Sequence, residues 1–215
     1  MSEMNATVDP AEVARFDALG AQWWDEKGKM APLHAMNPAR LAFLRDALVR
    51  HFSRDARALR PLKGLSILDI GCGGGLLSEP LARMGGQVRG IDPAPGNVDI
   101  ARTHAAASGL AVDYEAVTAE ELASRGDRFD VVVALEVVEH VADVSLFVRT
   151  AGQLVAEGGV LVLSTLNRTA KSFALAIVGA EYVLRWLPPG THRWEKFITP
   201  EELEATLAAA GFAAR

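Results

Sequence analysis

The sequence predicts an α/β fold with a doubly wound, mostly parallel sheet, preceded by an N-terminal helical extension. From Ser66 onward, short β-branched runs alternate with alanine- and leucine-rich helical patterns, which is typical of parallel strands joined by crossover helices. Runs such as DVVVAL (130–135) are apolar on both faces, as expected of interior strands covered by helices. The 215 residues, half of them hydrophobic, suffice for one domain with a buried core.

The elements follow from these patterns in chain order. We expect residues 1–65, which carry the helical aromatic clusters RFDALGAQWWD and RLAFLRDAL, to pack on the same domain as the rest. We expect residues 66–215 to form the cofactor-binding core, with an insertion at about 168–198 that contacts the substrate or a membrane. Helices are expected where a glycine follows as a stop signal, at 75–84, 97–108 and 144–155. The expected strands are 66–71, 87–92, 112–117, 129–136 and 158–166.

Charge and cysteine content narrow the function classes. The formal net charge of -5 argues against a protein that follows a phosphate backbone, so no nucleic-acid partner is expected. The single cysteine, Cys72, permits neither an intramolecular disulfide nor a thiolate metal cluster, and it is expected to be a small packing residue. No stretch has signal-peptide character or a charge-free run of about 18 residues. A cytoplasmic location is expected, with membrane association left open.

A carboxylate precedes the glycine run in ILDIGCGGGLL (67–77). Glycine allows a sharp turn and close approach of a ligand, although the pattern alone also fits a plain strand-to-helix turn. Asp92 stands at the end of the second expected strand, about 20 residues beyond Gly71, where an acid can bind ribose hydroxyls. Two classes of nucleotide-like cofactor, the dinucleotides and S-adenosylmethionine, are bound by this arrangement.

The position of Asp69 separates the two classes. A dinucleotide places its pyrophosphate against the glycine loop and would be repelled by this carboxylate. S-adenosylmethionine (SAM) has no phosphate and carries an ammonium and a sulfonium, so the sequence favours SAM and its product S-adenosylhomocysteine. Asp69 has a structural alternative as well, because it could accept hydrogen bonds from the amides of its own loop.

The stretches LDIGCGGG, GIDPA and FDVVVALEVVEHV resemble the motifs of the class I SAM-dependent methyltransferases. Their Rossmann-like fold agrees with the sheet expected here. The resemblance implies that Asp69, Gly71 and Gly73 line the methionine part of SAM and that Asp92 binds its ribose.

The same resemblance implies the rest of the cofactor pocket. Thr118 and Ala119 would lie near the adenine, and Leu135, at the end of the fourth strand, would close the pocket. Arg40, in NPARL, would reach the carboxylate of SAM, where a guanidinium makes charge-assisted hydrogen bonds. Without the resemblance, Arg40 would also fit a helix surface.

Two longer segments are similar to the ubiquinone biosynthesis O-methyltransferase family, namely RFDALGAQWWDEKGKMAPLHAMNPARLAFL and TLNRTAKSFALAIVGAEYVLRWLPPGTHRWEKFITPEEL. This likeness covers nearly the whole chain. It implies methylation of ring hydroxyls of polyprenylated phenol and catechol intermediates at two pathway steps, with other quinone-pathway enzymes as assembly partners. Family members continue with two more strands beyond AAGFAAR, so either the chain is incomplete there or the sheet lacks an edge hairpin.

The stretch EVVEHV places Glu136, Glu139 and His140 at the exit of the fourth strand, the end at which α/β proteins bind ligands. A catechol hydroxyl must lose a proton for methyl transfer, which requires a base or a Lewis-acidic metal. One hypothesis is that the three side chains hold a divalent cation such as Mg or Zn. The other is metal-free, with His140 and Glu139 as the catalytic residues and Glu136 shaping the pocket.

The segment SFALAIVGAEYVLRWL (172–187) has apolar residues at helical spacing but is too short and too charged to span a bilayer. It fits either a core helix or an interfacial helix resting on lipid. Since a polyprenyl substrate dissolves in membrane, we expect peripheral association with an anionic membrane surface, at its inner face. Trp23 and Trp24 would line the opposite wall of the mouth or pin the N-terminal helix. Alternatives are another small-molecule or RNA O-methyltransferase and a dinucleotide-binding module.

Overall fold

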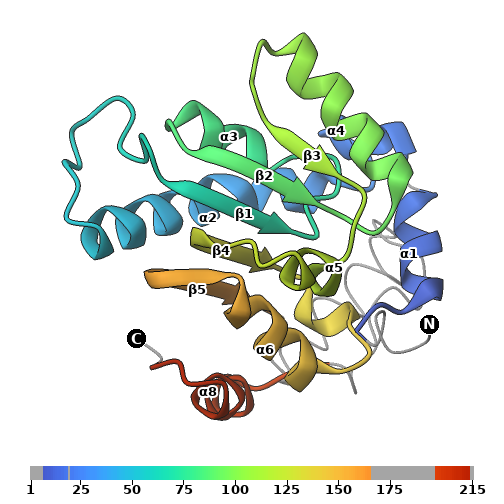
Figure 1. Ribbon diagram of the computed structural model, residues 1–215. Helices are drawn as coiled ribbons and strands as arrows, with labels where there is room; N and C mark the ends of the chain where they lie inside the picture. The colour runs from blue at the N-terminus through green and yellow to red at the C-terminus, as the bar shows by residue number, and fades with distance from the viewer. Residues whose placement is uncertain (1–6, 19, 166–196, 214–215) are drawn as a thin grey trace.

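The computed structural model describes residues 7–18, 20–165 and 197–213 and is built around a sheet of five strands (Figure 1). All the paired strands are parallel, in the order β3-β2-β1-β4-β5. The order reverses between β1 and β4, which creates the switch point where open α/β sheets bind ligands. The predicted doubly wound sheet is therefore confirmed. The strands are β1 (Ser66–Ile70), β2 (Gln87–Ile91), β3 (Asp113–Glu115), β4 (Phe129–Leu135) and β5 (Val155–Ser164).

Helices cover both faces of this sheet. Leu44 and Leu81 pack with Ile67 on one face, whereas Leu122 and Phe147 pack on the other face. The α-helices are α1 (Pro10–Asp17), α2 (Ala31–His51), α3 (Ser78–Arg83), α4 (Pro95–Ala107), α5 (Ala119–Ser124), α6 (Val144–Gln153) and α8 (Pro200–Ala209). Two 3-10 helices, η1 (Gly20–Trp24) and η2 (Val138–His140), complete the described elements. Because successive strand residues point to opposite faces, both apolar sides of the strands are buried.

The structure corrects the predicted elements at three places. β5 begins at Val155, because Val155 pairs with Phe129 ahead of a register shift, so the predicted helix at 144–155 ends earlier, at Gln153. α5 and α8 were not predicted. Each begins with a capping box, in which Thr118 pairs with Glu121 and Thr199 with Glu202. The T-x-x-E pattern that gives these starts was readable in the sequence.

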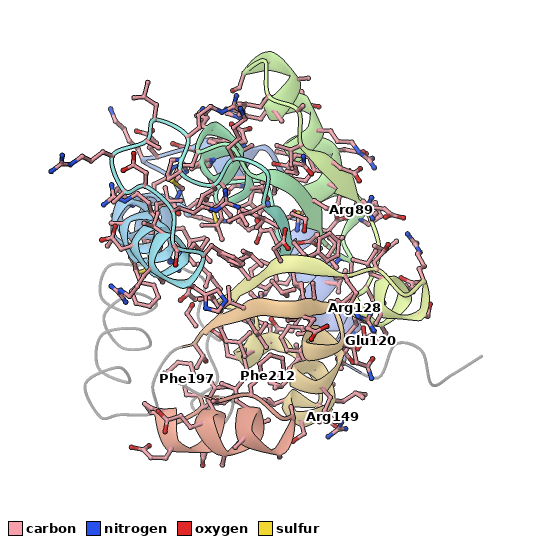
Figure 2. The ribbon with its side chains drawn as sticks, turned by 60° about the vertical axis from the view of Figure 1, so that its left-hand side comes forward. Arg89, Glu120, Arg128, Arg149, Phe197 and Phe212 are labelled. Carbon is pink, nitrogen blue, oxygen red and sulfur yellow. The ribbon has the colours of Figure 1, made fainter. Side chains whose placement is uncertain are left out.

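The N-terminal helices lie against the carboxyl ends of the strands. α1 and η1 both contact α4, and the Asp17 carboxylate accepts a hydrogen bond of 2.9 Å from the Gly96 amide at the start of α4 (Figure 1). At the other end of the chain, α8 packs on α6, and Phe212 lies against Gly152 (Figure 2). The extension thus forms part of the wall around the switch point.

The predicted membrane segment lies outside the described residues, as does most of the expected insertion at 168–198. In the described part of the chain, no helix combines the length and apolar character needed to cross a bilayer.

Candidate active site

A cavity of about 490 Å³ opens at the carboxyl ends of β1, β2 and β4, at the switch point. Its walls come from these strand ends, from η2 and from the N-terminal helices α1 and α2. The cavity brings together all but one of the residues predicted as functional, namely Arg40, Asp69, Gly71, Asp92, Thr118, Ala119, Leu135, Glu136, Glu139 and His140.

Gly73 is the exception. Both Gly71 and Gly73 have positive φ, +71° and +52°, a conformation that glycine adopts without strain. A Cβ on Gly73 would lie 2.4 Å from the indole of Trp23, which covers this residue. Gly73 does not line the cavity as it stands, because Trp23 lies on that side of the loop, and its contact with the methionine part of SAM stays a prediction. Gly73 contributes instead through its amide, which donates to Asp92 at 3.0 Å.

Asp92 ties the end of β2 to the glycine loop and to α4. Besides the Gly73 amide, its carboxylate accepts hydrogen bonds from the Ala94 amide at 2.9 Å and from the Asn97 side chain at 3.3 Å. Burial raises the pKa of Asp92, and these three donors oppose that rise. Since a carboxylate has about four acceptor positions, the cavity-facing group retains capacity for a ligand hydroxyl.

Asp69 is a buried acid at the end of β1. The Ser78 hydroxyl, from the start of α3, donates to it at 2.5 Å, so its described partner is not an amide of its own loop. Burial raises the pKa of Asp69 to about 7, the Ser78 bond lowers it, and the charge of Asp92 raises it further. Two buried carboxylates so placed favour a cationic ligand group.

Arg40 of α2 forms an ion pair with Glu136 at the exit of β4. Glu136 has a positive φ of 52°, uncommon for a residue with a side chain, and its carboxylate also accepts from the Ser164 hydroxyl at 2.7 Å. Burial lowers the pKa of Arg40, and the charge of Glu139 opposes that change. The pair sets a cation and an anion on the cavity wall beside the glycine loop.

His140 is oriented by a residue of the N-terminal extension. Its Nδ1 lies 3.0 Å from the Glu12 carboxylate of α1, and Phe16 packs edge-on against the imidazole ring. Arg15 holds the same carboxylate of Glu12 at 2.6 Å. With Nδ1–H donated to Glu12, the neutral ring carries its lone pair on Nε2, the nitrogen suited to accept a proton. Sequence reasoning missed Glu12, which is 128 residues away from His140.

The predicted cation site is not assembled in this arrangement. Within the described ranges, no three His, Cys, Asp or Glu side chains are grouped so that they could hold a metal ion. Glu136 is directed to Arg40 and Ser164, and His140 to Glu12, so these two predicted ligands turn to different partners. The proposed metal ligands Glu136, Glu139 and His140 therefore share the cavity wall without forming a ligand set.

The turn from β3 into α5 also lines the cavity. Thr118 caps α5 through its hydroxyl, which accepts from the Glu121 amide at 3.2 Å, and Ala119 is buried beside it. Leu135, the last residue of β4, also lines the cavity. These neighbours present small or apolar surface, which suits a flat aromatic ring better than a charged group.

The two adjacent tryptophans of η1 fasten the extension to the glycine loop. The Trp23 indole donates to the Asn97 side chain at 2.8 Å, and the Trp24 indole donates to the Gly74 carbonyl at 2.9 Å. Trp24 also stacks on His104 with ring centroids 3.4 Å apart. Trp24 pins the segment, as one interpretation of the sequence predicted, and Trp23 lines the cavity. The other interpretation, a wall opposite residues 172–187, involves a segment outside the described residues and stays a prediction.

Cys72 is buried in the glycine loop and packs near Val98 and Tyr114. Burial raises the pKa of its thiol well above the ordinary value, and the charges of Asp69 and Asp92 raise it further. The thiol stays protonated at neutral pH, as the packing role predicted from the sequence requires.

Comparison with known proteins gives a consistent result. A family model described as "Methyltransferase domain" matches residues 37–215. A protein of Azorhizobium caulinodans named ubiquinone biosynthesis O-methyltransferase is 74% identical over 208 residues, which cover 97% of this chain and 82% of the relative. A protein of the same name from Rhizobium etli is 58% identical over 206 residues, covering 96% and 83%.

Solved structures resemble the fold. Magnesium protoporphyrin IX methyltransferase from Synechocystis PCC 6803 with bound SAM has a TM-score of 0.63 at 20% identity, covering 98% of this chain and 90% of that one. The structure of the same protein with bound SAH has a TM-score of 0.64 at 22% identity, covering 96% and 91%. At these identities the likeness concerns the fold, and it confirms the predicted Rossmann-like, class I methyltransferase sheet.

Proposed function

Because the chain belongs to the ubiquinone biosynthesis O-methyltransferases, which carry out SAM-dependent O-methylation, we propose that its cavity holds SAM beside a ring hydroxyl of a polyprenylated phenol or catechol. The observation that carries this proposal is the convergence of Asp69, Asp92 and His140 on one cavity at the switch point. The two acids suit the cofactor, and the histidine suits the loss of the hydroxyl proton. Methylation at two pathway steps would use the same cavity.

The residues present fit SAM. Asp92 keeps acceptor capacity toward the cavity and would bind the ribose hydroxyls. Asp69, a buried carboxylate that accepts a hydrogen bond from the Ser78 hydroxyl, would face the ammonium group. Arg40 would bind the carboxylate, since its guanidinium has five donors and can serve Glu136 as well. Thr118 and Ala119 would lie near the adenine, with Leu135 closing the pocket.

The chain's own residues then prepare the acceptor. SAM, when bound, supplies an electrophilic methyl group. His140 would take the proton of the substrate hydroxyl on Nε2, and Glu12 would hold the ring and stabilise the imidazolium that results. Glu139, buried on the same wall, adds negative charge beside Arg40 and favours its charged form. The mostly apolar lining excludes water and holds the aromatic ring in place.

Turnover of a short-chain polyprenyl catechol with radiolabelled SAM tests the proposal directly. Methylated product that depends on both His140 and Asp92 would support it, and an enzyme that binds SAM but transfers no methyl group to the catechol would contradict it. Equilibrium dialysis with SAM and with a dinucleotide shows which of the two cofactors the protein binds. The buried Asp69 at the glycine loop disfavours the dinucleotide.

Binding of SAM is expected to weaken in mild acid. Asp69 has a pKa of about 7 in the cofactor-free protein, and an ammonium favours its carboxylate form, so binding must release a proton below that pH. The dissociation constant should rise about tenfold for each pH unit below about 7. Calorimetry in two buffers of different ionisation enthalpy measures the proton release. Asp69→Asn is the matched control, and its affinity should be weaker but flat with pH.

The same raised pKa has an effect on stability. Since the folded value of about 7 exceeds the unfolded value of about 3.9, folding takes up protons between the two. The contribution of Asp69 is therefore complete below about pH 4 and is lost as the pH rises through about 7. A SAM affinity that is constant from about pH 6 to 8 would contradict the predicted proton release, and a free energy of unfolding without this pH dependence would contradict the stability effect.

Replacing Glu12 by glutamine is expected to lower kcat by at least about tenfold with little change in the KM for SAM. The amide keeps the size of the side chain but loses the charge that stabilises the imidazolium. Steady-state kinetics separates kcat from KM, and Glu12→Asp should restore part of kcat. Glu26→Gln, at an exposed position outside the cavity, is the control. A full kcat in Glu12→Gln would remove the orienting role.

A divalent cation is a separate hypothesis from the sequence. The described side chains do not fit a cation as they stand, so no step of the mechanism passes through one. A cation bound by Glu136, Glu139 and His140 would first require Glu136 to leave Arg40 and His140 to leave Glu12. Loss of turnover in chelator, with recovery on addition of Mg or Zn, would reinstate the hypothesis.

We further propose a cytoplasmic enzyme that associates peripherally with the inner face of an anionic membrane and assembles with other quinone-pathway enzymes. The support is chemical, because a polyprenylated substrate resides in the bilayer and must reach the cavity from there.

A further inference from the structure

Thr7, just ahead of α1, is a buried polar residue that contacts two distant parts of the chain. It is 3% exposed. Its hydroxyl donates a hydrogen bond to the carboxylate of Glu120, which lies 113 residues away at the start of α5. Its carbonyl accepts a hydrogen bond of 2.9 Å from the amide of Ala142, two residues beyond His140. Thr7 therefore connects the N-terminal extension both to α5 and to the segment that carries His140.

The position of α1 depends on contacts at its two ends. The helix has eight residues, all described, and none of them is buried. A helix this short is marginal by itself, so contacts with the rest of the protein must hold it. On one side, Asp9 caps the helix by accepting from the Ala11 amide at 3.0 Å, and Thr7 lies two residues earlier. On the other side, Asp17 accepts from the Gly96 amide at 2.9 Å. A change at either end should therefore shift the helix.

Two side chains of α1 contact the imidazole of His140. The Glu12 carboxylate lies 3.0 Å from Nδ1, and Phe16 packs edge-on against the ring. Figure 1 shows α1 at the end of the sheet toward which the strands point, where the cavity opens. A shift of α1 that lengthens the contact between Glu12 and His140 would weaken the preference of the ring for the Nδ1–H tautomer.

Glu120 joins this arrangement to the cofactor pocket. It directly follows Thr118 and Ala119, the residues expected near the adenine, and it lines the same cavity. One of its carboxylate oxygens accepts from Thr7. The other is buried and has no hydrogen-bond partner among the described residues. Because an unpaired buried acceptor is costly, Glu120 would be stabilised by a hydrogen-bond donor of a ligand in this part of the cavity.

We infer that Thr7 is a positioning residue for His140. Its hydrogen bond to Glu120 holds α1 in place so that Glu12 orients the imidazole, and the same bond links the base to the part of the cavity where the adenine would lie. Thr7 takes no proton itself and acts through Glu12. The inference rests on the proposed function, because His140 is a base only if the cavity carries out methyl transfer.

NMR of the cofactor-free protein tests the positioning without turnover. Long-range ¹H–¹⁵N spectra distinguish the two tautomers of a neutral imidazole, and the signals of His140 are those that disappear in His140→Ala. The wild type should show the Nδ1–H tautomer. Thr7→Val removes the hydroxyl donor and should shift His140 toward a mixture of the two tautomers, whereas Thr7→Ser keeps the hydroxyl and should restore the wild-type signals. Unchanged His140 signals in Thr7→Val would overturn the inference.

A double-mutant cycle tests whether Thr7 acts through Glu12. Thr7→Val alone should lower kcat about tenfold with little change in the KM for SAM, because a misplaced group slows the chemical step. In the Glu12→Gln background the same change should lower kcat by less than about twofold, since two changes that act through one contact are not additive. Losses that multiply would overturn the inference, because Thr7 would then act independently of Glu12.

Thr103→Val is the matched control, since it removes the same hydroxyl outside the cavity lining. Thr103 is exposed on α4, and its hydroxyl donates to the Asp99 carbonyl of the same helix at 2.8 Å. Its kcat and its His140 signals should equal those of the wild type. A loss of kcat as large as that of Thr7→Val would overturn the inference.

Glu120→Ala covers the case in which Thr7→Val does not fold, as judged by its melting temperature. This variant removes the acceptor of the same hydrogen bond and should change the His140 signals and kcat in the same direction. Wild-type His140 signals in folded Glu120→Ala, with normal turnover in the wild-type enzyme, would overturn the inference alone. Absent turnover of a catechol by the wild-type enzyme would instead overturn the proposed function.

Discussion

Replacement of His140 by alanine is expected to lower kcat by about 10²–10⁴-fold, the range that a positioned general base supplies. The physical reason is that the substrate hydroxyl must lose its proton, and the His140 imidazole lines the same cavity as Asp69 and Asp92. Affinity for SAM should stay within about threefold, because the residues expected to bind it are untouched. Single-turnover kinetics measures the chemical step, and calorimetry measures the affinity.

His51→Ala is the control for this experiment. His51 lies at the exposed end of α2, where its ring contacts the Gly158 carbonyl at 2.9 Å, and it does not line the cavity. Its kcat should equal that of the wild type. If His140→Ala retains most of its kcat, the base is another group, and the orienting role of Glu12 is lost with it.

Replacement of Asp92 by alanine is expected to weaken SAM binding by at least about 1.5 kcal/mol, or more than about tenfold. Two losses combine here. The carboxylate that would bind the ribose disappears, and the Gly73 amide and the Asn97 side chain lose an acceptor, so the glycine loop is held less firmly. Calorimetry with SAM and with S-adenosylhomocysteine should show the same loss for both.

Asp92→Asn separates these two contributions. The amide oxygen can still accept from the loop but carries no charge, so its loss of affinity should lie between those of the wild type and the alanine variant. A melting temperature within a few degrees of the wild type shows that the variant is folded. Unchanged affinity in Asp92→Ala would remove the ribose assignment.

The parts of the site that the sequence predicted are those in which short motifs follow strand ends. Asp69 lies near the end of β1 and Asp92 directly follows β2, and the carboxyl ends of parallel strands lie at one edge of the sheet. The positions of these two acids relative to the glycine loop can therefore be predicted from a short stretch of sequence. The same holds for Glu136 and His140 after β4, which is why their presence at the cavity could be predicted.

The partners of these residues could not be predicted in the same way. The contacts between Glu12 and His140, and between Arg40 and Glu136, join helices of the N-terminal extension to strand ends far along the chain. They depend on how α1 and α2 pack, and no periodicity or motif encodes that packing. For the same reason the sequence did not show that Trp23 would cover Gly73.

The two indoles on the glycine loop give the protein an optical property. Trp23 is buried against Gly73 and Gly74, and Trp24 is stacked on His104, so both ring systems sit beside the bonds that hold Asp92 and the loop in place. Indole emission depends on the polarity and the quenching groups around the ring. Any ligand that displaces or tightens this segment will therefore change the intrinsic fluorescence, and occupancy of the cavity becomes visible without a label.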